Sequence, residues 1–168
     1  MYFNVDTTTP LVLTGGFTIP PRFARILVQG TDVNQAIANT YTSRMTAPTT
    51  GSQSEIWTTL SGQIFPIYFD YATPQNIYIK IYYDPGQPTT SNWLGLAAAQ
   101  IITLNNTYLI GEAVNQNEIS GVLTNFNGAT ITGVTVSLDG ITYARSVQPN
   151  ANAYPVFSTA NITQVSGP

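Results

Sequence analysis

The amino-acid sequence predicts an all-β protein: a two-sheet antiparallel sandwich and, more specifically, a single jelly roll with loose terminal arms. Short apolar or alternating segments are separated by Gly, Pro, Asn or Asp at intervals of roughly 8–12 residues, a spacing typical of sandwiches and barrels. β-Branched and aromatic residues fill these segments, as half-buried strands prefer. Helical signals are weak, because Thr, Asn and Tyr oppose a helix over 33–45 and residues 94–100 suggest only one turn.

The predicted strands follow one another along the chain. They are residues 11–13, 23–29, 55–60, 63–71, 76–83, 100–104, 107–113, 121–124, 130–138, 141–147 and 155–158. A chain of 168 residues is long enough to bury roughly 70% of its unfolded surface, so residues 1–168 are expected to form one domain. Residues 1–10 and 163–168 are expected to be terminal arms, since chain ends are usually poorly ordered unless they dock.

The clearest predicted hairpin lies around Asp139 and Gly140. An Asp-Gly pair between two alternating segments is typical of a type I′ turn, in which both central residues have positive φ. A two-residue loop would place four apolar side chains on the core face: Leu138 opposite Ile141, and Val136 opposite Tyr143. Asp139 and Gly140 are therefore predicted to be structural turn residues.

A second hairpin is predicted between residues 63–71 and 76–83, joined by a turn over 72–75. In its second strand, alternation sends three isoleucines to one face and Tyr78, Lys80 and Tyr82 to the other. Pro66 lacks an N–H, so its strand is expected to be an edge strand or to contain a bulge.

Six residues are predicted interface candidates. Tyr is enriched at subunit interfaces, and long loops such as 46–54 and 84–92 often make contacts. The candidates are Tyr78, Lys80, Tyr82, Trp93, Pro48 and Pro88. The aromatic residues of the predicted central hairpin and its neighbours allow a second interpretation, a flat platform on which sugars stack. They are Tyr68, Tyr71, Tyr78, Tyr82, Tyr83, Trp57 and Trp93.

The charge content argues against several classes of partner. Only 8% of residues are charged, against about a quarter in typical soluble domains. The five basic residues are scattered, which argues against nucleic-acid binding because phosphate contacts need clustered Lys and Arg. No segment reaches the ~18 apolar residues of a membrane span, and the N-terminus does not resemble a signal peptide, so we expect synthesis in a host cytoplasm without membrane insertion.

The sequence predicts neither an enzyme nor a cofactor or metal site. It has no His and no Cys, which removes the usual acid–base and nucleophilic groups. Glu112 and Glu118 form the nearest pair of carboxylates, but nearby Gly and Asn residues favour solvated turn positions. Residues 115–118 resemble a calcium loop only faintly, because the leading Asp is missing.

A charge-poor all-β chain of this size, rich in Thr, Asn, Tyr and Pro, resembles the single jelly-roll coat proteins of tailless icosahedral phages with an internal membrane, of the small major capsid protein type. The resemblance implies a virion protein that packs with itself, as a dimer or higher oligomer, and with a second capsid protein. The scarcity of charged residues on the predicted strand edges agrees with this expected self-packing. Few charges protect them from pairing, so neighbouring subunits are expected to cover them.

Two other functions remain open from the sequence. A decoration or cement protein would form a compact oligomer and bind only preformed shells. A fibre tip, adhesin or lectin-like module would bind glycans or a receptor through exposed Tyr or Trp side chains.

Overall fold

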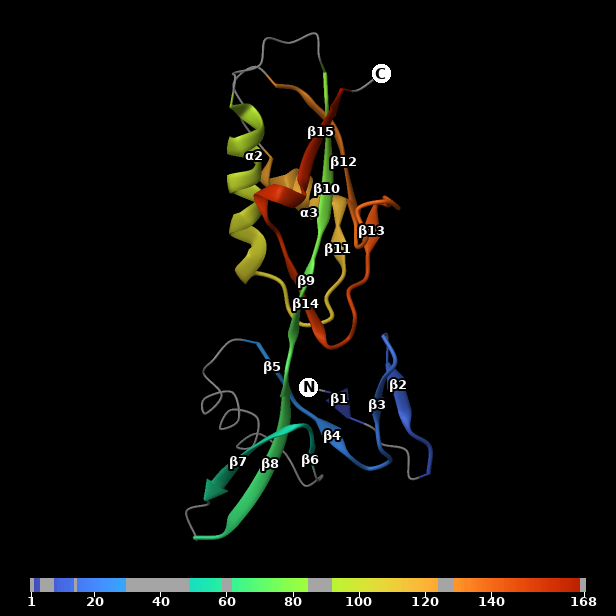
Figure 1. Cartoon of the computed structure of the whole chain (residues 1–168), viewed down its shortest axis with the longest axis vertical. Coiled ribbons are helices and arrows are strands. Elements are labelled where there is room, and N and C mark those ends of the chain that lie inside the picture. The colour runs from blue at the N-terminus through green and yellow to red at the C-terminus, as the bar shows by residue number, and fades with distance from the viewer. Residues whose placement is uncertain are drawn as a thin grey trace. The chain divides into compact units, whose positions relative to one another are not determined.

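The computed structural model describes residues 2–3, 8–13, 15–29, 49–58, 62–84, 92–123 and 129–166. The chain divides into two compact units, Met1–Thr73 and Pro74–Pro168. Strands outweigh helices over the described residues and form several antiparallel and mixed sheets (Figure 1), which confirms the all-β class. The jelly-roll topology and the single domain stay predictions.

The first unit consists of short sheets. These are β1 (Tyr2–Phe3) with β4 (Ala24–Arg25) and β6 (Thr49–Thr50), β2 (Leu11–Leu13) with β3 (Phe17–Ile19), and β5 (Leu27–Val28) with β8 (Ile64–Tyr71) and β7 (Gln53–Thr58). β7 and β8 run antiparallel, whereas β5 joins the other side of β8 in parallel. The buried apolar side chains of this unit are Ile19, Ala24, Ile26, Leu27, Val28, Ile67 and Phe69.

The second unit is built around β10 (Tyr78–Tyr83). This strand lies between β12 (Ile131–Ser137), which is antiparallel to it, and β15 (Ile162–Ser166), which is parallel. The other strands form two small sheets: β9 (Thr73–Asn76) with β14 (Ala153–Val156), and β11 (Val114–Asn115) with β13 (Ser146–Val147). Because residues 163–166 lie in β15, that part of the expected C-terminal arm is a paired strand.

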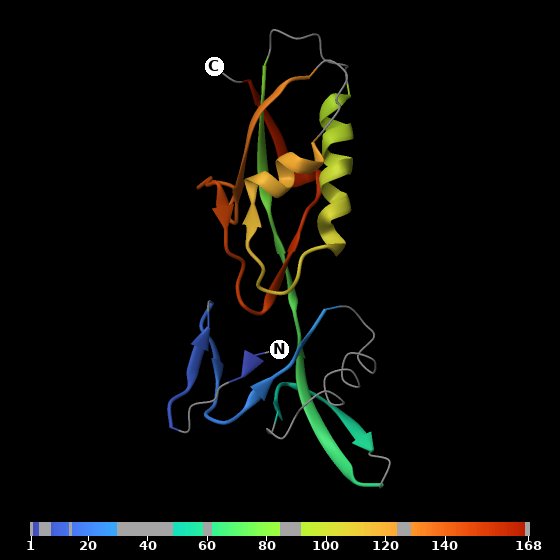
Figure 2. The same ribbon diagram turned by 180° about the vertical axis from the view of Figure 1, so that it is seen from behind.

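Two α-helices cover one face of the central sheet of the second unit. They are α2 (Trp93–Ile102) and α3 (Gln116–Val122), and Figure 2 shows α2 running alongside the strands. The short helices η1 (Thr103–Asn106) and η2 (Thr159–Asn161) complete the unit. Its core joins the isoleucines of 77–81 to α2, α3 and β12; the buried members include Ile77, Ile79, Ile81, Trp93, Ile101, Ile119, Val136 and Phe157.

The helices replace several predicted strands. Residues 100–104 belong to α2 and η1, residues 121–122 end α3, and 107–113 contain no strand. Alanines and leucines give α2 strong helix propensity. Asn115 and Glu118 form a capping box at the start of α3, a local signal that was present in the sequence.

The predicted hairpin between 63–71 and 76–83 is wrong. β8 pairs with β7 and β5, whereas β10 pairs with β12 and β15. The connection is extended, because β9 includes Thr73 and Pro74 and a residue that precedes proline favours extended backbone. Pro66 itself lies in β8 at a position where β5 is not paired, so the predicted edge character holds locally.

The loop after β12 also differs from the predicted type I′ turn. Gly140 has φ of +73°, but Asp139 is not among the residues with positive φ. Val136 pairs with Ala144 instead of Tyr143, and Ile141 is 83% exposed instead of core-facing. Side-chain hydrogen bonds decide this loop: Asp139 Oδ1 accepts from the N–H groups of residues 141 and 142, and Ser137 Oγ accepts from those of 139 and 140.

Candidate functional site

The predicted alternation of β10 is confirmed. Ile79 and Ile81 are fully buried, whereas Tyr78, Lys80 and Tyr82 are half-buried on the opposite face. In the ladder with β12, Lys80 lies opposite Thr135. The three predicted interface residues of this strand are therefore brought together on one side of the sheet, away from the helices.

Tyr143 joins these residues, which the sequence did not predict. Lys80 Nζ lies 3.9 Å from the centroid of the Tyr143 ring, a cation–π contact. Partial burial raises the pKa of Tyr143, and the charge of Asp139 acts in the same direction. Tyr78, Lys80, Tyr82 and Tyr143 are called the Tyr/Lys face below.

The remaining predicted interface residues lie elsewhere. Trp93 is only 5% exposed and packs beside Tyr83, with ring centroids 5.0 Å apart, so it is a core residue and not a surface contact. Its place at the first turn of α2 turns the ring toward the apolar side of the sheet. Pro48 and Pro88 lie outside the described residues.

The carboxylates of the second unit have structural partners. Glu118 Oε2 accepts hydrogen bonds from the Tyr108 hydroxyl, at 2.7 Å, and from the N–H of Asn115. Burial, with Glu118 beside it, raises the pKa of Tyr108. Glu112 Oε2 accepts from the N–H of Leu109 at 2.6 Å. These bonds fix a helix start and a turn.

Over the part of the chain that the structure describes, no group of three or more His, Cys, Asp or Glu side chains is placed to hold a metal ion. Among the same residues, no helix has both the length and the apolar character needed to cross a membrane.

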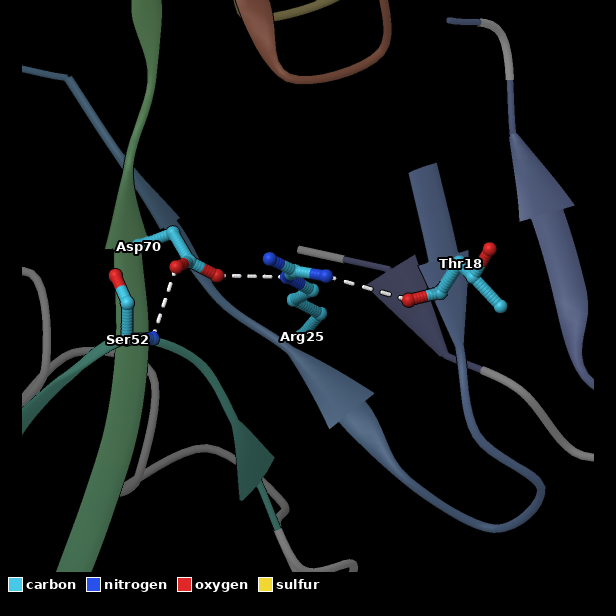
Figure 3. Close-up of polar contacts among 4 residues, drawn as sticks. All are labelled: Thr18, Arg25, Ser52 and Asp70. Carbon is cyan, nitrogen blue, oxygen red and sulfur yellow. Dashed lines mark hydrogen bonds and ion pairs between the residues drawn. The ribbon is translucent and has the colours of Figure 1, made fainter. Parts of the chain in front are cut away.

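An ion pair anchors the β7–β8 hairpin within the first unit. Figure 3 shows Arg25 between Asp70 and Thr18: Arg25 Nε lies 2.6 Å from Asp70 Oδ2, and its Nη1 donates to the carbonyl of Thr18 at 3.3 Å. The N–H of Ser52 donates to the other carboxylate oxygen of Asp70 at 2.9 Å. Burial raises the pKa of Asp70, but the hydrogen bonds from Arg25 and Ser52 outweigh it and hold the pKa below its usual value.

One face of the β7–β8 hairpin is apolar and exposed. Ile56 is 72% exposed, Ile64 65% and Tyr68 42%, and Pro66 is exposed between them. Ile56 lies directly opposite Pro66 in the ladder, so these side chains share one side of the sheet. Ile56, Ile64, Pro66 and Tyr68 are called the apolar strip below.

Sequence reasoning missed the apolar strip, although a signal was present. Residues 64–69 read Ile-Phe-Pro-Ile-Tyr-Phe, an unbroken apolar run instead of an alternating one. Such a run indicates a strand that is covered on both faces. Ile67 and Phe69 are buried on one face of β8 by the chain itself. The apolar run therefore predicted a cover for the second face as well, which this chain does not supply among its described residues.

No known protein-family model matches this chain, and no characterised protein is significantly similar to it in sequence. The Tyr/Lys face, the apolar strip and the composition are therefore the features that bear on its function.

Proposed function

We propose that this chain is a structural protein of a virion, a capsid coat subunit that packs with copies of itself and with a second capsid protein. The observation that carries the proposal is the apolar strip, in which two isoleucines are about two-thirds exposed on one side of a hairpin. Single exposed apolar residues are ordinary, but a contiguous apolar patch on a soluble protein commonly marks an interaction site.

The energetics favour covering this strip. Burial of apolar surface contributes roughly 25 cal/mol per Å², and isoleucine side chains have little conformational entropy to lose compared with long charged ones. The low charge content acts in the same direction. With a net charge of −3 over 168 residues, copies of the chain repel one another weakly, so close packing of like subunits needs little electrostatic compensation.

The direct test is the native mass by light scattering on a size-exclusion column, across protein concentration and salt. Dimers or larger species that grow with concentration are expected of a coat subunit. A closed trimer that stops growing would favour the cement protein instead. A strict monomer at millimolar concentration would contradict any self-packing role.

The Tyr/Lys face favours a second candidate, a module that binds glycans. The Lys80 ammonium lies over the Tyr143 ring, Tyr82 is half-buried on the same face of β10 as Lys80, and aromatic rings of this kind can stack on sugars. Under this function, a glycan array gives saturable binding that Tyr82→Ala weakens by roughly fivefold, since a stacking contact contributes about 1 kcal/mol. Leu109→Ala, at an exposed residue of the same unit, serves as the control. An array without binding would rule this candidate out.

A further inference from the structure

We infer that β7 is the edge along which a second copy of this chain pairs, antiparallel, about a two-fold axis through Ile56. The inference rests on the proposed self-packing function and names the contact that carries it. It follows from which backbone groups of β7 already have partners, from the charge pattern along the strand, and from the position of the apolar strip.

Over the part of the chain that the structure describes, the outer edge of β7 is open. Among the described residues β7 pairs with β8 alone, so one of its two edges has no strand beside it. An open edge presents N–H and C=O groups that another strand can bind. The charge that would protect it is limited to Glu55.

The hydrogen bonds of β8 show which residues of β7 point outward. The N–H of Tyr68 donates to Thr49 Oγ1 at 2.8 Å, and the N–H of Asp70 donates to the carbonyl of Ile26 at 3.0 Å. Both groups lie on the side of β8 away from β7. The direction of the backbone N–H and C=O groups alternates along a strand, so the backbone groups of Pro66 also point away from β7. The N–H that Pro66 lacks would therefore not have bonded to β7, and no β7–β8 hydrogen bond is lost.

Residues opposite one another in an antiparallel ladder either both bond across it or both point away. Ser54, Ile56 and Thr58 lie opposite Tyr68, Pro66 and Ile64. These three residues of β7 therefore direct their N–H and C=O groups to the open edge. All three are exposed.

A two-fold axis normal to the sheet must bring one residue opposite its own copy. An axis at Glu55 would oppose two carboxylates directly, which destabilises a strand pair. An axis at Trp57 would leave Ser54 beyond the end of the partner strand. An axis at Ile56 pairs Ser54 with Thr58 of the other copy and Ile56 with itself, so every outward N–H and C=O of the strand is satisfied.

The axis at Ile56 also joins the two apolar strips. Ile56 would lie beside Ile56 of the second copy on the exposed face, which removes from water a side chain that is 72% exposed. The two strips would then form one continuous apolar surface across four strands. In the same register, Glu55 would lie opposite residue 57 of the second copy and not opposite a like charge.

The absence of cysteine permits a direct test by single-cysteine cross-linking under mild oxidation. In Ile56→Cys the two Cα atoms would be about 5.5 Å apart, within the range of a disulfide. In Ser54→Cys the two Cα atoms would lie four residues apart along the strands, about 13 Å. In Glu55→Cys the two Cα atoms would be about 8 Å apart. We expect Ile56→Cys to give a covalent dimer on a non-reducing gel and the other two to remain uncross-linked.

A backbone substitution gives an independent readout. Ile56→Pro removes an N–H that points to the open edge and leaves the β7–β8 bonds in place, so it should weaken dimerisation at least tenfold by light scattering. Ile56→Thr, which keeps the N–H and the β-branched shape, is the matched control and should retain most of the dimer. Circular dichroism confirms that each variant is folded.

These experiments distinguish failure of the Ile56 two-fold contact from failure of the proposed coat function. If the chain self-associates but the disulfide forms at residue 54 or 55, or at none of the tested residues, the Ile56 axis is wrong and the coat function stands. If the unmodified chain is monomeric at all concentrations, both fail. Cross-linking at residue 56 together with loss of the dimer in Ile56→Pro supports both.

Discussion

Arg25 Nε lies 2.6 Å from Asp70 Oδ2, joining β4 to the end of β8. The two side chains are 23% and 14% exposed, so solvent screens the pair only partly. Asp70 also accepts the N–H of Ser52, which directly precedes β7. The Asp70 carboxylate therefore fixes the open end of the β7–β8 hairpin, where β7 begins and β8 ends. The apolar strip lies on this hairpin.

Asp70→Asn should destabilise the first unit by about 2 kcal/mol, because hydrogen bonds to a charged group contribute about 1.5–3 kcal/mol. Urea unfolding at low protein concentration measures the change. Glu55→Gln, at an exposed acidic residue of β7, is the control and should alter stability by less than about 0.5 kcal/mol. Equal stability of the two variants would contradict the anchoring role.

Asp70 should also make stability depend on acidic pH. Its pKa in the folded chain lies below the ordinary value of 3.8, so its contribution is present above that value and is lost as the pH falls through the folded-state pKa. Asp139, with a pKa lowered to about 2 by hydrogen bonds from Ile141, Ser137 and Thr142, acts in the same direction. Unfolding measured between pH 5 and pH 2 should show a smaller slope for Asp70→Asn than for the unmodified chain.

Ser137→Ala should destabilise the second unit by about 1 kcal/mol or more. Ser137 is fully buried, and its Oγ accepts the N–H groups of Asp139 and Gly140, which would lose this acceptor. Thermal unfolding measures the effect. Ser146→Ala, at an exposed serine of β13, should leave the unfolding temperature nearly unchanged; an equal loss in both variants would argue against the loop hydrogen bonds.

Gly140→Ala should be destabilising by about 1–3 kcal/mol. Gly140 has φ of +73°, and an added Cβ would lie 3.1 Å from the Tyr78 ring. Gly121→Ala is the matched control, because a Cβ in α3 meets nothing within 4 Å and Ala should stabilise a helix by up to about 1 kcal/mol. Chemical denaturation of both variants should give shifts of opposite sign, and a neutral Gly140→Ala would contradict the packing of Tyr78 on this turn.

Ile56→Lys should abolish self-association, because a buried ammonium at the two-fold contact would face its own copy. The loss is expected to exceed tenfold in the dimer dissociation constant, measured by sedimentation equilibrium. Ile141→Lys introduces the same charge at a residue that is 83% exposed in the second unit, and should leave the association unchanged. Equal loss in both variants would indicate a nonspecific effect of charge.

The sequence by itself determined the all-β class and the two faces of β10. A period of two along residues 77–82 places isoleucines on one side and Tyr78, Lys80 and Tyr82 on the other in any sheet, whichever strands lie beside them. The low charge content, 8% of residues, only predicts surfaces suited to contact with other protein.

Tertiary structure alone decided the partners of each strand. β10 pairs with β12 and β15, which follow it by about 50 and 80 residues along the chain, and no local pattern specifies such distant neighbours. The loop at Asp139 took a different form because side-chain oxygens of Ser137 and Asp139 bind its N–H groups, and those bonds outweigh the preference of an Asp-Gly pair for a type I′ turn.

The apolar strip became visible only once the register of β7 and β8 was known. Both faces of residues 64–69 are apolar, so sequence periodicity cannot tell which face the chain buries itself. Ile67 and Phe69 pack inward, and Ile56 lies opposite Pro66 on the other side. Exposure is a property of the packed molecule, because it depends on which distant segments cover a side chain and which leave it in water.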